Sequence, residues 1–72
     1  MLSEIRRKKD RRAQLDQARQ QLSELRADIG EAYEVFNSTV DPQLLEATIF
    51  EISALQSRYS CLLRSLKSLQ SQ

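Results

Sequence analysis

Two runs of apolar residues, spaced alternately by three and four positions, dominate this 72-residue chain. This spacing lines the side chains up along one stripe of an α-helix, and no segment sustains the two-residue alternation of a strand. We therefore predict an all-α protein. The two runs together are called the seam. They consist of Leu15, Ala18, Leu22, Leu25, Ile29, Ala32 and Phe36, and of Leu45, Thr48, Ile52, Leu55, Tyr59, Leu62, Leu66 and Leu69.

The only proline, Pro42, separates the two runs. A short connection between two helices makes them antiparallel neighbours, so the chain is expected to form a two-helix hairpin over residues 13–72. We expect one helix over about 13–36, a turn over 37–41 and a second helix over about 42–69.

The turn residues have capping chemistry of their own. Asp41 is expected to accept a hydrogen bond from a free amide of the second helix, and Pro42 suits its first position because no amide is needed there. Val40 and Leu45 have the spacing of a hydrophobic staple. Asn37 is the candidate left-handed residue that closes the first helix.

One hairpin is too small to bury its own seam. Two helices leave each seam side chain about half exposed to solvent, while ordering the chain costs about 1.5 kcal/mol per residue in conformational entropy. We therefore predict self-association, most simply a dimer that forms a four-helix bundle or an antiparallel coiled coil. The expected packing and interface residues are Leu22, Leu25, Ile29, Phe36, Leu45, Ile49, Phe50, Ile52, Leu55, Tyr59, Leu62 and Leu66.

Apolar residues outside the seam gather near the turn. They are Tyr33, Val35, Leu44, Ile49, Phe50 and Leu63. A helix with several neighbours needs such a wide apolar stripe, whereas a two-stranded coiled coil does not. Near the turn we expect a cluster that is either the dimer interface or a docking patch for an unidentified protein partner. It consists of Tyr33, Phe36, Leu44, Ile49 and Phe50.

Charge is distributed unevenly along the chain. Residues 1–12 carry a net charge of +4, residues 13–40 carry −3, and residues 41–72 carry none. The first segment is called the basic arm, and its bases are Arg6, Arg7, Lys8, Lys9, Arg11 and Arg12. The second helix is too short to cover this arm, which is expected to be a helical overhang or disordered. Its candidate roles are a solvated extension, contact with nucleic-acid phosphates, or attraction to an anionic membrane surface.

Several kinds of chemistry lack the residues they need. The chain has no His, one Cys and one Gly, which argues against zinc sites, Cys-His or Ser-His-Asp catalysis and phosphate-cradling loops. No apolar run approaches the roughly 18 residues of a membrane span. The absence of an export signal and of paired cysteines favours the cytoplasm. We expect no cofactor and no enzymatic activity.

Two neighbouring residues of the second helix have alternative interpretations. Tyr59 occupies a seam position, and Arg58 beside it is expected to form an ion pair with Glu51 or Asp28. The alternative is a binding hot spot, since Tyr and Arg are enriched in such spots. Cys61 lies outside the seam and is expected to be an inert thiol.

The second segment begins Asp41-Pro42-Gln43-Leu44-Leu45-Glu46-Ala47 and ends in Arg58-Tyr59 and Leu62-Leu63-Arg64. This run, residues 41–64, resembles the YaaL-like family of short bacterial proteins of unknown function, found mainly in Firmicutes. The similarity covers about a third of the chain, and the first helix is similar only in character. It implies a small cytoplasmic helical protein without assigned catalytic or binding residues. The matching positions are Asp41, Pro42, Leu44, Leu45, Glu46, Ala47, Ile49, Phe50, Glu51, Ala54, Arg58, Tyr59, Leu62, Leu63 and Arg64.

These observations favour a non-enzymatic, self-associating protein-interaction module. The alternative is a nucleic-acid-associated accessory protein that contacts phosphates through Arg6–Arg12.

Overall fold

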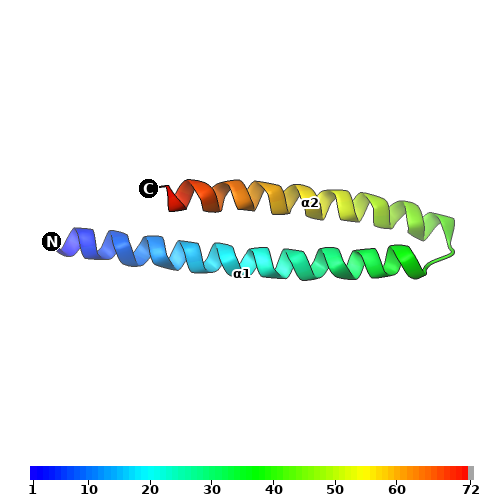
Figure 1. Cartoon of the computed structure of the whole chain (residues 1–72), viewed down its shortest axis with the longest axis horizontal. Coiled ribbons are helices and arrows are strands. Elements are labelled where there is room, and N and C mark those ends of the chain that lie inside the picture. The colour runs from blue at the N-terminus through cyan, green and yellow to red at the C-terminus, as the bar shows by residue number, and fades with distance from the viewer. Residues whose placement is uncertain (72) are drawn as a thin grey trace.

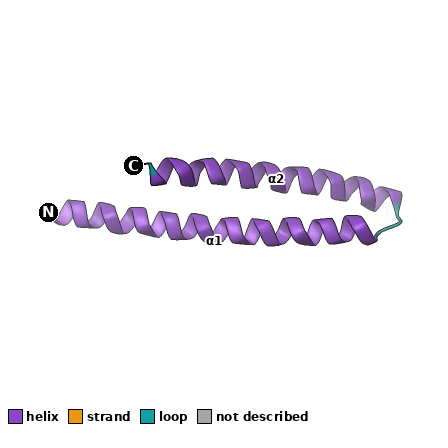
Figure 2. Ribbon diagram, viewed as in Figure 1, coloured by secondary structure: helices purple, strands orange, loops and turns teal. Residues whose placement is uncertain are grey.

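The computed structural model describes residues 1–71, which form two long helices lying side by side and antiparallel (Figure 1). Helix α1 spans Leu2–Ser38 and helix α2 spans Pro42–Gln70. The hairpin measures 61 × 15 × 13 Å, and nearly all of it outside the link between the helices is helical (Figure 2). The predicted all-α antiparallel hairpin is confirmed, and its assembly into a dimer stays a prediction.

Helix α1 is longer than α2, with 37 residues against 29. Because the two helices meet at the link, the other end of α1 projects beyond the end of α2 (Figure 1). Eight extra residues correspond to about 12 Å of helix. The basic arm, residues 1–12, is therefore helical, and most of it has no helix of the same chain beside it.

The link consists of residues 39–41 and is shorter than the expected turn over 37–41. Thr39 is extended, and its amide donates to the carbonyl of Val35 at 3.0 Å. The prediction for Asn37 is wrong, since Asn37 lies inside α1 and no residue of the described chain, glycine included, has a positive φ. The chain leaves α1 directly in extended form, which suits the restriction that Pro42 places on the residue before it.

Asp41 is the N-cap of α2, and its Oδ1 accepts a hydrogen bond from the amide of Gln43 at 3.0 Å. Pro42 follows at the first helical position, where its missing amide costs nothing. The expected staple does not form, because Val40 is 94% exposed and cannot cover Leu45. The reason is geometric: an extended link of three residues points the Val40 side chain into solvent.

The core is the seam. Every seam residue is buried or half-buried, and elsewhere in residues 1–71 only Arg11, Thr39 and Leu63 are not exposed. Two clusters form: Ala18 and Leu22 of α1 with Leu66 of α2, and Ala32 of α1 with Ile52 and Leu55 of α2.

Thr48 is the one polar seam residue, and it is 2% exposed. Its hydroxyl donates to the carbonyl of Leu44 at 2.7 Å, so the buried oxygen has a partner within its own helix. Its methyl group is left to pack between the helices.

Candidate protein-interaction surface

The hairpin leaves apolar side chains uncovered at both of its ends. At the link these are Tyr33, Val35, Val40, Leu44, Ile49 and Phe50, which we call the loop-end patch. At the open end they are Met1, Leu2 and Ile5. Ile49 and Phe50, expected to be interface residues, are 51% and 67% exposed in the hairpin. Any packing of these two side chains therefore requires another molecule.

One flank of the seam carries a hydrogen bond between the helices close to the loop-end patch. The Gln56 amide nitrogen Nε2 donates to the Tyr33 hydroxyl at 3.0 Å. Both residues line a shallow depression of about 280 Å³ together with Phe36, Ile49 and Ile52. The spacing of the seam residues did not predict this pair, because the pair depends on the axial register between the two helices.

The Tyr59 hydroxyl has a hydrogen-bond partner on the other helix. Arg26 donates from its Nη2 atom to the Tyr59 hydroxyl at 2.9 Å, and its guanidinium carbon lies 5.9 Å from the centre of the ring. The hydrogen bond to Tyr59 raises the pKa of the Arg26 guanidinium above its usual value. Sequence reasoning missed Arg26, which lies 33 positions away from Tyr59 in the chain.

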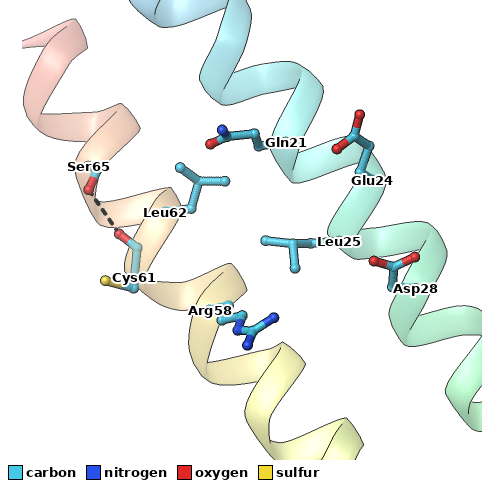
Figure 3. A pocket seen from close by; sticks show the side chains of 8 residues that line it. All are labelled: Gln21, Glu24, Leu25, Asp28, Arg58, Cys61, Leu62 and Ser65. Atoms are coloured by element: carbon cyan, nitrogen blue, oxygen red, sulfur yellow. Dashed lines mark hydrogen bonds between the residues drawn. The ribbon is translucent and has the colours of Figure 1, made fainter.

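Arg58 forms no ion pair with Glu51 or Asp28 within residues 1–71, so that prediction is wrong; elsewhere, on α1, Arg19 and Asp16 pair at 3.7 Å. Arg58 instead lines an open groove between the helices together with Asp28 (Figure 3). Glu51 lines the neighbouring part of this groove, which Asp28 and Arg58 share. The expected partners thus surround Arg58 without closing to ion-pair distance.

This groove runs along one flank of the seam and is predominantly acidic. Leu25 and Leu62 extend toward each other within it, one from each helix (Figure 3). Its first part encloses about 420 Å³ and its second about 380 Å³, with Val35 at the end nearer the link. We call it the acidic groove, because four carboxylates line it against the single guanidinium of Arg58. The carboxylates are those of Glu24, Asp28, Glu31 and Glu51.

The other flank of α1 is basic. Arg12, Arg19, Arg26 and Tyr33 follow one another at intervals of seven residues, so they lie along one side of the helix. No carboxylate shares that row. The hairpin therefore has an acidic flank and a basic flank, which composition alone conceals behind a net charge of +1.

The six bases of the basic arm occupy positions 6–12 of a continuous helix, so they surround it and form no single face. All are exposed except Arg11, which is half-buried. Lys8, Arg11 and Arg12 line a depression of about 310 Å³ with Leu15 and Arg19, next to the point where α2 ends.

Cys61 is exposed, and its sulfur points away from the acidic groove (Figure 3). Within residues 1–71, no three carboxylate, thiol or imidazole side chains come together in a way that suits a metal ion. Neither α1 nor α2, as far as the chain is described, contains a stretch long and apolar enough to cross a membrane.

No family model, no curated protein and no solved structure matches this chain. The functional argument therefore rests on the residues and on their arrangement in the hairpin.

Proposed function

We propose that this chain is a non-enzymatic interaction module that associates with a second copy of itself. The observation that supports this most directly is the exposure of the loop-end patch, where Phe50 is 67% and Ile49 51% accessible. Large apolar side chains gathered in this way are typical of surfaces that bind another protein. Membership in the YaaL-like family, suggested by residues 41–64, is part of the same proposal and assigns no activity.

The incomplete burial of the seam supports the same conclusion. Many seam residues, among them Leu25, Ile29 and Leu62, are only half-buried between two helices. A second hairpin would remove more of this surface from water, at about 25 cal/mol for each Å² of apolar area. Self-association thus adds the burial that a two-helix chain lacks.

Sedimentation equilibrium of the full chain tests the proposal. We expect a mass of twice 8.3 kDa at micromolar concentration. Two double variants probe the two flanks: Val35→Ser with Leu44→Ser, and Ile49→Ser with Phe50→Ser. At least one of them should raise the dissociation constant of the dimer, while Ser57→Ala, a control on the exposed outer side of α2, should not. A helical monomer at every concentration would overturn the proposal.

The alternative function is contact with nucleic-acid phosphates, which the exposed bases on a helical arm would favour. Binding of this kind weakens steeply with salt, in proportion to the number of phosphates neutralised. A chain lacking residues 1–12 would then lose binding to duplex DNA or RNA while keeping the rest of its helical signal. Equal binding by the full and shortened chains would rule out this role for the arm.

A further inference from the structure

The residue types along α1 follow an order that would match a second copy of α1 laid antiparallel to it. Beginning at the open end, exposed apolar residues Leu2 and Ile5 precede the bases of residues 6–12. A middle stretch of low net charge follows, and then the exposed acids Glu24, Asp28, Glu31 and Glu34. An exposed apolar residue returns at Val35, at the end of the acidic groove, whereas Tyr33 belongs to the basic row. Two such helices laid antiparallel would place apolar against apolar and basic against acidic.

We propose that two copies of this chain pack antiparallel, with the basic arm of each lying in the acidic groove of the other. This arrangement rests on the proposed self-association and specifies its geometry. The occupant is a second copy of the chain, because its arm is part of a continuous helix and has a net charge of +4, whereas four carboxylates line the groove against one guanidinium.

Two independent alignments give the same register. Pairing Leu2 with Val35 of the second copy places the two-fold axis close to Arg19 of α1. Aligning the centre of the bases in 6–12 with the centre of the acids in 24–34 also places the axis close to Arg19. The apolar ends and the charged blocks therefore agree on one register along the helix axis.

The two flanks of the seam differ in whether they can receive the arm. The acidic groove offers four carboxylates against Arg58, and half-buried Leu25 and Leu62 gain cover when a helix lies over them. The opposite flank carries the row of Arg12, Arg19 and Arg26, which would repel a basic helix. Charge complementarity thus selects the acidic flank.

Charge reversal tests the arrangement in the full chain by sedimentation. Arg6→Glu with Arg7→Glu should raise the dissociation constant about ten-fold or more, since like charges then meet in the groove. Asp28→Lys with Glu31→Lys should do the same. Mixing these two variants should restore association as a heterodimer, because both arm-to-groove contacts regain opposite charges. The matched control, Arg64→Glu with Lys67→Glu on the outer side of α2, should leave the constant unchanged.

Cross-linking tests the direction of packing. In a Cys61→Ser background, Gln17→Cys lies near the two-fold axis, and a short thiol cross-linker should join two chains through it. Ser3→Cys occupies the same side of α1 two heptads away, and antiparallel packing separates its two copies by about 48 Å. It should not cross-link.

The outcomes separate this inference from the proposed function. A wild-type chain that never dimerises defeats both. A dimer that is indifferent to both the arm reversal and the groove reversal, or that cross-links through Ser3→Cys as well as Gln17→Cys, defeats the arrangement and leaves self-association standing. Loss of nucleic-acid binding by the arm reversal without any change in dimerisation would also overturn it.

Discussion

The two ends of the hairpin contain the same helix in different surroundings. Near the link, α2 covers α1, and Ile52 is 7% exposed. At the open end, α1 runs alone and Ile5 is 50% exposed. The seam changes character where α2 ends, since the positions one heptad before Leu15 and Ala18 are Lys8 and Arg11. Apolar residues thus occupy the stripe only where a second helix of the same chain is present to cover it.

The difference shows what stabilises the helical structure at each end of the hairpin. The covered part of α1 is stabilised by burial against α2, whereas the basic arm depends on helix propensity and on its continuity with the rest of α1. Substitutions near the link should therefore cost stability, and equivalent substitutions in the arm should not.

The largest expected effect is at the centre of the covered region. Ile52→Ala should lower the free energy of unfolding by about 2–5 kcal/mol, because it removes a buried side chain and leaves a cavity. Ile5→Ala in the arm is the matched control and, at protein concentrations below the dissociation constant of the dimer, should change stability by less than about 0.5 kcal/mol. Urea denaturation followed by circular dichroism measures both. Equal losses would show that the arm is as well covered as the core.

The cap at the link comes next. Asp41→Ala should cost about 0.5–2 kcal/mol, because the amide of Gln43 loses its acceptor. Asp41→Asn keeps an acceptor and should retain most of the stability in the same denaturation experiment. If both variants lose the same amount, the charge of Asp41 and not its hydrogen bond is responsible.

A gain in stability is expected when the only glycine, Gly30, is replaced by alanine. Gly30 lies inside α1, and a Cβ atom added there would meet no atom within 4 Å. Gly30→Ala should therefore raise stability by roughly 0.5–1 kcal/mol through helix propensity alone. A higher melting temperature with an unchanged oligomeric mass would confirm this. A loss of stability would mean that another molecule approaches closely at that position.

The smallest effect is expected at the link itself. Val40→Ser should change stability by less than about 0.5 kcal/mol, because the Val40 side chain is exposed and staples nothing. A marked drop in the melting temperature would reveal a contact of Val40 that the hairpin alone does not make, most directly one with a second copy.

The fold was predictable because its cause is periodic. Steps of three and four residues specify a stripe on each helix, and Pro42 marks where one helix stops and the next begins. The side contacts were not predictable in the same way. The hydrogen bond from Arg26 to Tyr59 depends on the axial register of α1 against α2. At another register, a different polar side chain of α1 would lie opposite Tyr59.

The link shows a further limit. Asn37 and Val40 both had residue types suited to standard motifs, and both motifs are absent. Local preferences of this kind are worth about 1 kcal/mol or less, and the path that the chain must take between two packed helices outweighs them.

The amino-acid sequence by itself determined that this protein is helical, where its apolar stripes lie, and where it bends, since each follows from spacing along one chain. Only the tertiary structure decided which side chains meet across the seam, and that Glu51 of α2 lines the same groove as Asp28 and Glu31 of α1. These depend on how one helix lies against another, which is a property of packing between distant residues and not of any local pattern.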